Sequence, residues 1–140
     1  MAHWIPGWES FPVQLHAFWS ERHLCSLSSA RPDGTLHTVP VGVTVDAEQR
    51  CAWVITDGGS VKARRIGAAG AGGLPVSACQ IDGARWSTLE GRAIVDGSAD
   101  AVRRAVECYE QRYRRPRENP TRVALRIEVS RFLVSGSLLD

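Results

Sequence analysis

The alternation of apolar and polar residues predicts that most of this chain is β-strand. The pattern is clearest near the C-terminus, where every second residue is apolar: Val123, Leu125, Ile127 and Val129. A period of two is typical of a strand with one buried face. Phe132 and Val134 then fall on the opposite parity, which predicts a β-bulge near Ser130.

Further strands precede this one. They are expected at residues 24–30, 36–45, 51–56, 76–81 and 86–95. Turns rich in Pro, Gly and Asp at 31–34 and 82–84 join the first two and the last two into hairpins. These hairpins favour an antiparallel arrangement over a parallel sheet.

Helical spacing of apolar residues predicts two helices, and a third short helix follows a glycine pair. The first covers residues 13–22, and the short one carries Lys62. The last begins after Ser98, a good N-cap, and ends before Pro116, with a buried stripe of Val102, Val106, Tyr109 and Tyr113. The sequence therefore predicts a single domain over residues 1–140, an antiparallel barrel with peripheral helices.

The strand at 36–45 has an unusual second face. Val39, Val41, Val43 and Val45 share one face, whereas Pro40 and Gly42 fall on the other. Proline removes a ladder donor, and glycine leaves room for a flat ligand against the backbone. An edge strand or a bulge explains the same residues, so both interpretations stay open.

Lys62 is the only lysine of the chain and follows Gly58, Gly59 and Ser60. Small residues allow close approach of a ligand, and a serine hydroxyl and a lysine can both bind phosphate. The segment predicts an anion site. The start of a helix with solvated basic residues would give the same pattern.

Composition and charge limit the classes of function that the chain can have. A formal net charge of +2 gives no indication of nucleic-acid binding, and no apolar run is long enough to span a membrane or act as a signal peptide. The four cysteines are widely spaced and predict buried free thiols rather than a metal site or disulfides. We expect a cytoplasmic protein. No catalytic residue can be assigned, so an enzyme would depend on an organic cofactor.

Four segments occur in the order found in a known family: residues 20–24 (SERHL), 54–63 (VITDGGSVKA), 82–93 (DGARWSTLEGRA) and 111–117 (QRYRRPR). With them the chain resembles, over nearly its whole length, the split β-barrel flavin and deazaflavin oxidoreductases, which include the pyridoxamine 5′-phosphate oxidases. The resemblance is strongest to members that reduce biliverdin with coenzyme F-420. Arg65 stands where related members often carry asparagine.

The resemblance implies a split β-barrel homodimer with a cofactor groove at the subunit interface. Ser60 and Lys62 would hold the phosphate. The deazaflavin ring would lie along His37, Thr38, Val39, Pro40 and Val41. Gln80 and Trp86 would lie near the cofactor, although Trp86 is equally well explained as a core or interface aromatic, and His37 as a solvent-facing residue. Arg85 and the arginines near Arg114 would bind the substrate's propionates, unless they are only solvated.

The implied reaction is hydride transfer from reduced F-420 to biliverdin or a similar small-molecule tetrapyrrole. Three alternatives remain. They are an FMN-dependent oxidase of the pyridoxamine phosphate type, an F-420-dependent reductase of another substrate such as a quinone, and a non-catalytic protein that binds a cofactor or tetrapyrrole.

Overall fold

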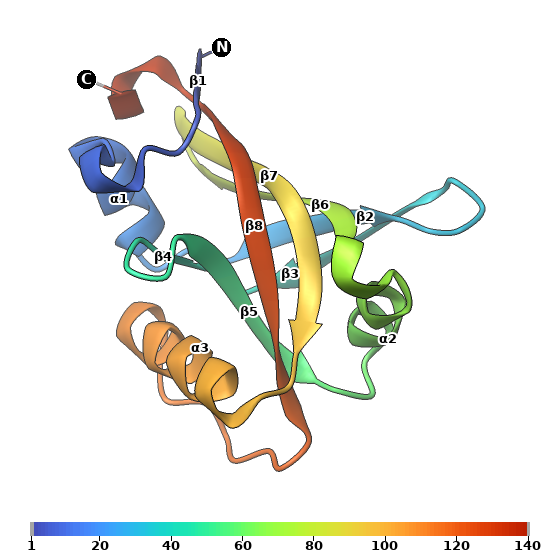
Figure 1. Cartoon of the computed structure of the whole chain (residues 1–140). Coiled ribbons are helices and arrows are strands. Elements are labelled where there is room, and N and C mark those ends of the chain that lie inside the picture. Colours follow the sequence, from blue (N-terminus) through green and yellow to red (C-terminus); the bar gives the residue numbers. More distant parts are fainter. Residues whose placement is uncertain (1, 140) are drawn as a thin grey trace.

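The computed structural model describes residues 2–139, in which eight strands form one antiparallel sheet. The strands are β1 (Ala2–Trp4), β2 (Cys25–Ala30), β3 (Leu36–Val41), β4 (Thr44–Asp46), β5 (Cys51–Asp57), β6 (Leu74–Asp82), β7 (Arg85–Asp96) and β8 (Arg122–Val134). Their order is β3-β2-β6-β7-β8-β5-β4, and β1 pairs with β8. The sheet curls so that β2 and β3 pass behind β7 and β8 (Figure 1).

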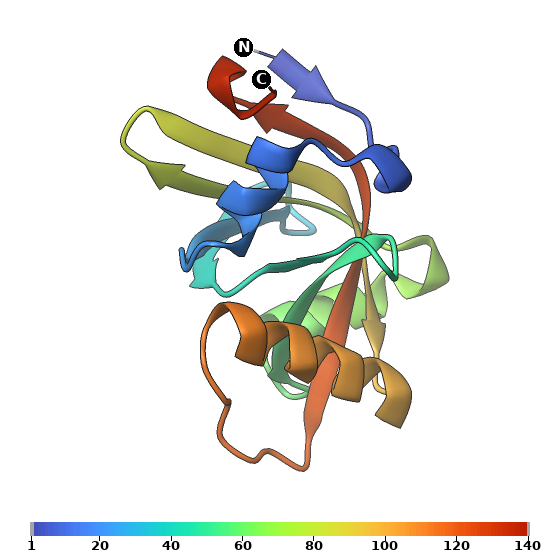
Figure 2. The ribbon, with the colours of Figure 1, turned by 90° about the vertical axis from the view of Figure 1, so that its left-hand side faces the viewer.

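Three α-helices surround the sheet: α1 (Val13–Ser20), α2 (Val61–Ala68) and α3 (Ala99–Arg112). Short 3-10 turns cover Trp8–Ser10, Gly70–Gly72 and Gly136–Leu139. Helices α1 and α3 lie on one side of the barrel and α2 lies on the other (Figures 1 and 2). A membrane-spanning helix is absent from residues 2–139. The expected antiparallel barrel with peripheral helices is confirmed.

The main core fills the curled sheet and is closed by α1. Leu15, Phe18 and Trp19 of α1 are buried against strand residues such as Leu89 and Phe132. A smaller cluster lies under α3 and contains Cys51, Trp53, Ala105, Cys108 and Ala124. The four cysteines are free thiols, as expected; three are buried and Cys79 is half-buried. Burial of these apolar side chains is the main stabilising contribution.

The expected strand at residues 36–45 is not continuous. It divides into β3, which pairs with β2, and β4, which pairs with β5. At the break, the amide of Val43 donates to the hydroxyl oxygen of Tyr113 at 3.1 Å, and its carbonyl accepts a hydrogen bond from Arg112. Because α3 satisfies both backbone groups of Val43, the chain can leave one strand partner and cross to another without orphaned polar groups.

Two expectations about the helices are corrected. Helix α1 ends at Ser20, whereas the expected helix extended to residue 22. In α3 the buried side chains are Ala105, Cys108 and Arg112, while Val102, Val106, Tyr109 and Tyr113 are only half-buried. Small residues let α3 approach the sheet closely, which turns the expected stripe toward the helix edge. The expected N-cap is correct, since the hydroxyl of Ser98 accepts from the Ala101 amide at 3.3 Å.

The predicted bulge lies at Ser130. Glu90 pairs with Arg131 and Gly91 with Val129, so Ser130 is the extra residue of β8. Gly91 is required there, because a Cβ atom would overlap the Glu128 carbonyl and lie 3.0 Å from the Val129 Cα. The bulge thus depends on close contact between two backbones.

Asp46 connects α3 to β4 and β5. Its carboxylate is almost fully buried and accepts two 2.8 Å hydrogen bonds from Arg104, one of 2.9 Å from the Trp53 indole and one of 3.1 Å from the Gln49 amide. Burial alone would raise the pKa of Asp46, but these bonds outweigh it and lower the pKa to about 2. The ionised carboxylate therefore stabilises the fold.

We predict that Gly91→Ala destabilises the protein by about 3 kcal/mol, because the added methyl group forces two backbones apart. Chemical denaturation measures the effect. Gly136→Ala is the matched control, since a Cβ there meets no atom within 4 Å. Equal stability of the two variants would contradict the close packing at the bulge.

We predict that Asp46→Asn flattens the acid side of the stability profile. The pKa of Asp46 lies below its unfolded value of 3.8, so its contribution is present above about pH 4 and is lost as the pH falls toward 2. Between about pH 5 and pH 2, the wild type should lose about 2 kcal/mol more than the variant in denaturation experiments. Glu48→Gln, which removes an exposed partner of Arg104, should follow the wild type. Parallel profiles for wild type and Asp46→Asn would disprove the assignment.

Candidate functional site: a basic groove beside α2

A groove of about 350 Å³ opens where β3, β5, α2 and the segment after α3 meet. We call it the basic groove. Its charged side chains are mostly cationic. It is lined by Pro40, Val41, Gly42, Ile55, Thr56, Asp57, Lys62, Tyr109, Arg114, Pro116, Arg117, Asn119 and Arg122. Four cations face one carboxylate, so the groove favours an anionic ligand.

Lys62 enters the groove from the first turn of α2. It is half-buried, and burial lowers the pKa of its ammonium group. Within residues 2–139 it has no ion pair or side-chain hydrogen bond, although a partly desolvated ammonium group gains from an anionic partner. Lys62 therefore offers its charge to a ligand.

Ser60 is the N-cap of α2. Its hydroxyl oxygen accepts from the Ala63 amide at 3.2 Å and from the Thr56 hydroxyl at 3.0 Å. A serine hydroxyl also has one proton to donate. Ser60 thus fixes the start of the helix that carries Lys62 and retains a donor for an anion.

The opposite wall of the groove is tied to the α2 entry loop through Asp57. Its carboxylate accepts hydrogen bonds from the Gly59 amide at 2.8 Å, from Asn119 at 3.4 Å and from the Thr121 hydroxyl. The Thr121 and Gly59 bonds are the chief causes that lower the pKa of Asp57. Because these donors already hydrogen-bond the Asp57 carboxylate, the cations of the groove stay available to bind an anionic ligand.

The positive field extends along β3. Desolvation lowers the pKa of His37, and the charges of Arg65, Arg31 and Lys62 lower it further. Arg65 itself donates to the Ser29 hydroxyl at 3.3 Å. The face of β3 nearest α2 is therefore cationic even with a neutral histidine.

Only part of the expected β3 site lines the groove. Pro40 and Val41 line it, whereas His37, Thr38 and Val39 lie farther along the strand. Among residues 2–139, β3 pairs only with β2, so Pro40 sits on an edge strand, one of the two interpretations left open. The room expected above Gly42 is filled, because a Cβ there would lie 2.9 Å from Tyr109 and 3.0 Å from Tyr113.

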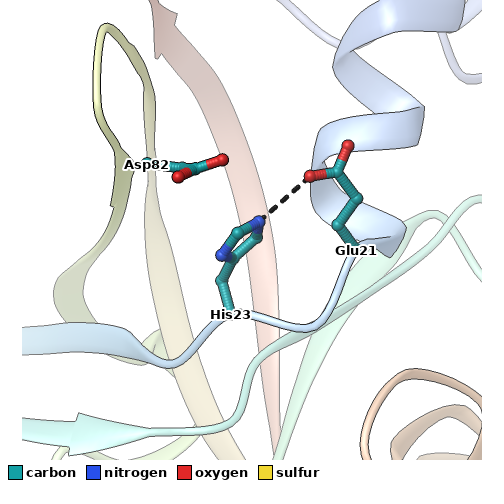
Figure 3. Close-up of side chains that lie close together, drawn as sticks. All are labelled: Glu21, His23 and Asp82. Carbon is teal, nitrogen blue, oxygen red and sulfur yellow. Dashed lines mark hydrogen bonds and ion pairs between the residues drawn. The ribbon is translucent and has the colours of Figure 1, made fainter.

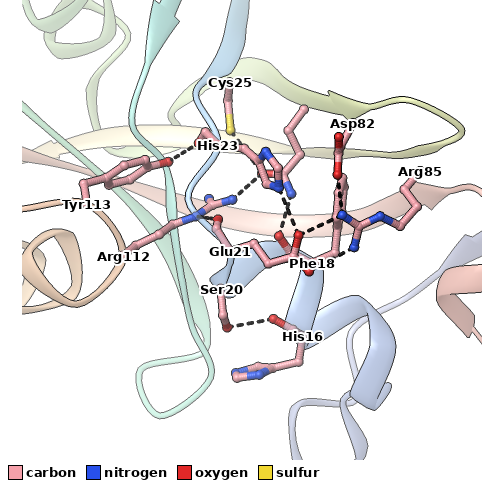
Figure 4. A network of polar contacts seen from close by, with 11 residues as sticks. His16, Phe18, Ser20, Glu21, His23, Cys25, Asp82, Arg85, Arg112 and Tyr113 are labelled. Carbon is pink, nitrogen blue, oxygen red and sulfur yellow. Dashed lines mark hydrogen bonds and ion pairs between the residues drawn. The ribbon is translucent and has the colours of Figure 1, made fainter.

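Gln80 lies in the core and not in the groove. Its side chain is 1% exposed; its amide nitrogen donates to the Phe18 carbonyl at 2.9 Å, and its oxygen accepts from Arg112. Arg112 and Tyr113 reach from the end of α3 into the same network (Figure 4). Because both ends of the Gln80 amide are occupied, it supports the fold near the site rather than contacting a ligand there.

Arg85 and Trp86 begin β7, at the end of the sheet away from α2 (Figure 1). Arg85 donates to both oxygens of Glu21 at 2.9 and 2.8 Å, and also to Asp82. Trp86 is half-buried; its amide donates to the Ser135 hydroxyl at 3.2 Å, and its carbonyl accepts from the Ser135 amide at 3.0 Å. Arg85 is therefore already paired with two carboxylates and is not a free substrate contact.

Glu21, His23 and Asp82 bring possible metal-ligand atoms within 4.8 Å of one another (Figure 3). The guanidinium of Arg85 lies between the two carboxylates (Figure 4). Hydrogen bonds from Arg85 and His23 lower the pKa of Glu21 to about 2. The cluster is thus an ion-pair network centred on arginine.

Sequence reasoning missed Tyr109, Asn119 and Arg122 as parts of the groove. They come from α3, from the segment after it and from β8, which the sequence alone does not bring together. The basic run around Arg114 was the one available signal.

Comparisons of the sequence with known proteins identify the family of this chain. A family model for pyridoxamine 5′-phosphate oxidase matches residues 11–135. An F-420-dependent biliverdin reductase of Mycobacterium tuberculosis is 51% identical over 124 residues, which is 89% of this chain and 88% of that protein.

Solved structures share the fold at low identity. An F-420 reductase aligns with a TM-score of 0.63 and 18% identity over 91% of this chain and 97% of its own. The heme storage protein HutZ of Vibrio cholerae aligns with a TM-score of 0.67 and 12% identity over 90% and 95%. The family match over most of the chain and the 51% identity show that this protein is an oxidoreductase and belongs to the pyridoxamine 5′-phosphate oxidase family.

Proposed function

We propose that this protein is a coenzyme F-420-dependent reductase that transfers a hydride to biliverdin or a similar tetrapyrrole. One observation supports it most: Lys62, which is half-buried and has no ion pair within residues 2–139, opens into a groove with Arg114, Arg117 and Arg122. A relative at 51% identity is an F-420-dependent biliverdin reductase. A phosphate-bearing anionic cofactor fits these charges.

Residues that line the groove would bind the cofactor together with Ser60, which does not line the groove but caps the helix that carries Lys62. Lys62 would neutralise the phosphate, and the Ser60 hydroxyl would donate to it. Pro40 and Val41 would form the floor beneath the ring. Reduced F-420 would supply the hydride, so the protein's contribution is to position donor and acceptor and to exclude water. Gln80 and Arg85 are left out, because their polar groups are already paired.

We propose further that the protein acts as a homodimer in the cytoplasm, with the cofactor at the subunit interface. Within residues 2–139 the outer edge of β3 pairs with no strand; it lies beside the groove, and Leu36 at its start is 71% exposed. An exposed apolar residue on an edge strand is suited to contact with a second subunit.

An FMN-dependent oxidase is the second candidate. The family match favours it, since that family carries the name of pyridoxamine 5′-phosphate oxidase. Both cofactors carry a phosphate, so the charges of the groove do not separate them. A direct measurement of binding distinguishes F-420 from FMN.

We predict that a paired fluorescence titration will show tighter binding of F-420 than of FMN, and that biliverdin will oxidise the reduced F-420 complex. The readout is the bleaching of biliverdin absorbance. Preference for FMN would move the assignment to the oxidase. Binding of F-420 without biliverdin turnover would keep the cofactor and overturn the substrate.

We predict that Lys62→Ala weakens F-420 binding about 10- to 100-fold, the effect of one lost charge-assisted hydrogen bond, while the melting temperature stays unchanged. Lys62→Arg should recover most of the affinity. Arg64→Ala is the matched control on the same helix, since Arg64 does not line the groove. Equal F-420 affinity in Lys62→Ala and Arg64→Ala would remove Lys62 from the site.

A further inference from the structure

A second cavity, of about 390 Å³, adjoins the basic groove. It is lined by Arg22, Leu24, Tyr109, Tyr113 and Arg114. We call it the tyrosine–arginine shelf. Tyr109 and Arg114 line both the shelf and the basic groove, so the two spaces share a border. A molecule on the shelf would therefore lie next to a ligand in the groove.

Backbone groups hold Tyr113 in place, and the ring of Tyr109 lies against it. Their ring centroids are 5.0 Å apart. The hydroxyl of Tyr113 donates to the His23 carbonyl at 2.6 Å and accepts from the Val43 amide at 3.1 Å. Both rings press on Gly42, where only a glycine leaves space for them. The shelf thus has a rigid aromatic surface suited to a flat ligand.

The two arginines of the shelf have charges to offer. Arg22 and Arg114 are exposed, and neither has an ion pair or a side-chain hydrogen bond within residues 2–139. Glu21 is the chain neighbour of Arg22, but its carboxylate is occupied by Arg85 and His23. No acid competes for these two guanidinium groups among the residues that line the shelf. They are therefore able to bind the carboxylates of a ligand.

We propose that the shelf binds the electron acceptor, and that it selects a planar conjugated molecule with two carboxylate arms. The conjugated framework would stack on Tyr109, and the arms would pair with Arg22 and Arg114. The inference rests on the proposed function, because biliverdin is such a molecule: a conjugated tetrapyrrole with two propionates. It assigns acceptor selectivity to the shelf and cofactor phosphate binding to Lys62.

The test measures binding of biliverdin and of its dimethyl ester by absorbance titration in the absence of F-420. We expect the wild type to bind the diacid about tenfold more tightly than the ester, the combined effect of two solvent-exposed charge pairs. Arg22→Gln with Arg114→Gln should abolish this preference. Arg115→Gln is the matched control, since Arg115 is exposed and lines neither space.

Tyr109→Leu provides an independent variant. It should weaken the diacid and the ester equally, because it removes stacking and leaves both charges in place. Equal affinity of the wild type for diacid and ester, or an unchanged preference in the arginine double variant, would overturn the proposal. Melting curves test whether each variant is folded. Arg22 is exposed, so we expect its substitution to leave the protein folded.

Failure of the shelf and failure of the proposed function are distinguishable. If F-420 binds and biliverdin is reduced with the same KM in Arg22→Gln as in the wild type, the reductase assignment stands and the shelf is refuted. If F-420 does not bind but the preference for the diacid depends on Arg22 and Arg114, the shelf stands and the reductase assignment fails. The F-420 affinity of Arg22→Gln should equal that of the wild type, since Arg22 does not line the groove.

Discussion

The site depends on the hydrogen bonds that the buried guanidinium of Arg112 donates. Arg112 is only 7% exposed, and within residues 2–139 no carboxylate is among its hydrogen-bond partners. It donates to the carbonyls of Glu21 and Val43 and to the amide oxygen of Gln80. A buried cation is tolerated only when such acceptors are in place. Four parts of the chain must therefore come together: the end of α3, the α1–β2 connection, the β3–β4 break and β6.

This junction also positions the functional surfaces. Tyr113 follows Arg112 and binds the same backbone at Val43, which places the tyrosine pair over Gly42. The chain then continues to Arg114 and Arg117, which line the basic groove. At the far side of the groove, Asp57 ties this segment to the loop before α2. The groove is thus fixed at both ends, although within residues 2–139 none of its four cations forms an ion pair.

Local features could be read from the sequence, whereas long-range contacts could not. The change of parity before Phe132 located the bulge, and the Ser98 cap located the start of α3, because both signals depend on neighbouring residues. The break after β3 was missed, since the groups that bind Val43 come from about 70 residues later in the chain. Arg112 was missed for a related reason: a periodicity argument counts arginine as solvated, and only the fold supplies its acceptors.

The same distinction applies to the candidate site. Lys62 could be proposed because a lysine after two glycines and a serine is a local pattern. Its roles, and those of Ser60 and β3, stay predictions. The most direct measurement is a crystal structure of the protein with bound F-420. We predict that the cofactor phosphate will lie within hydrogen-bond distance of Lys62 in the basic groove. A phosphate bound away from Lys62, with the groove empty, would contradict the account.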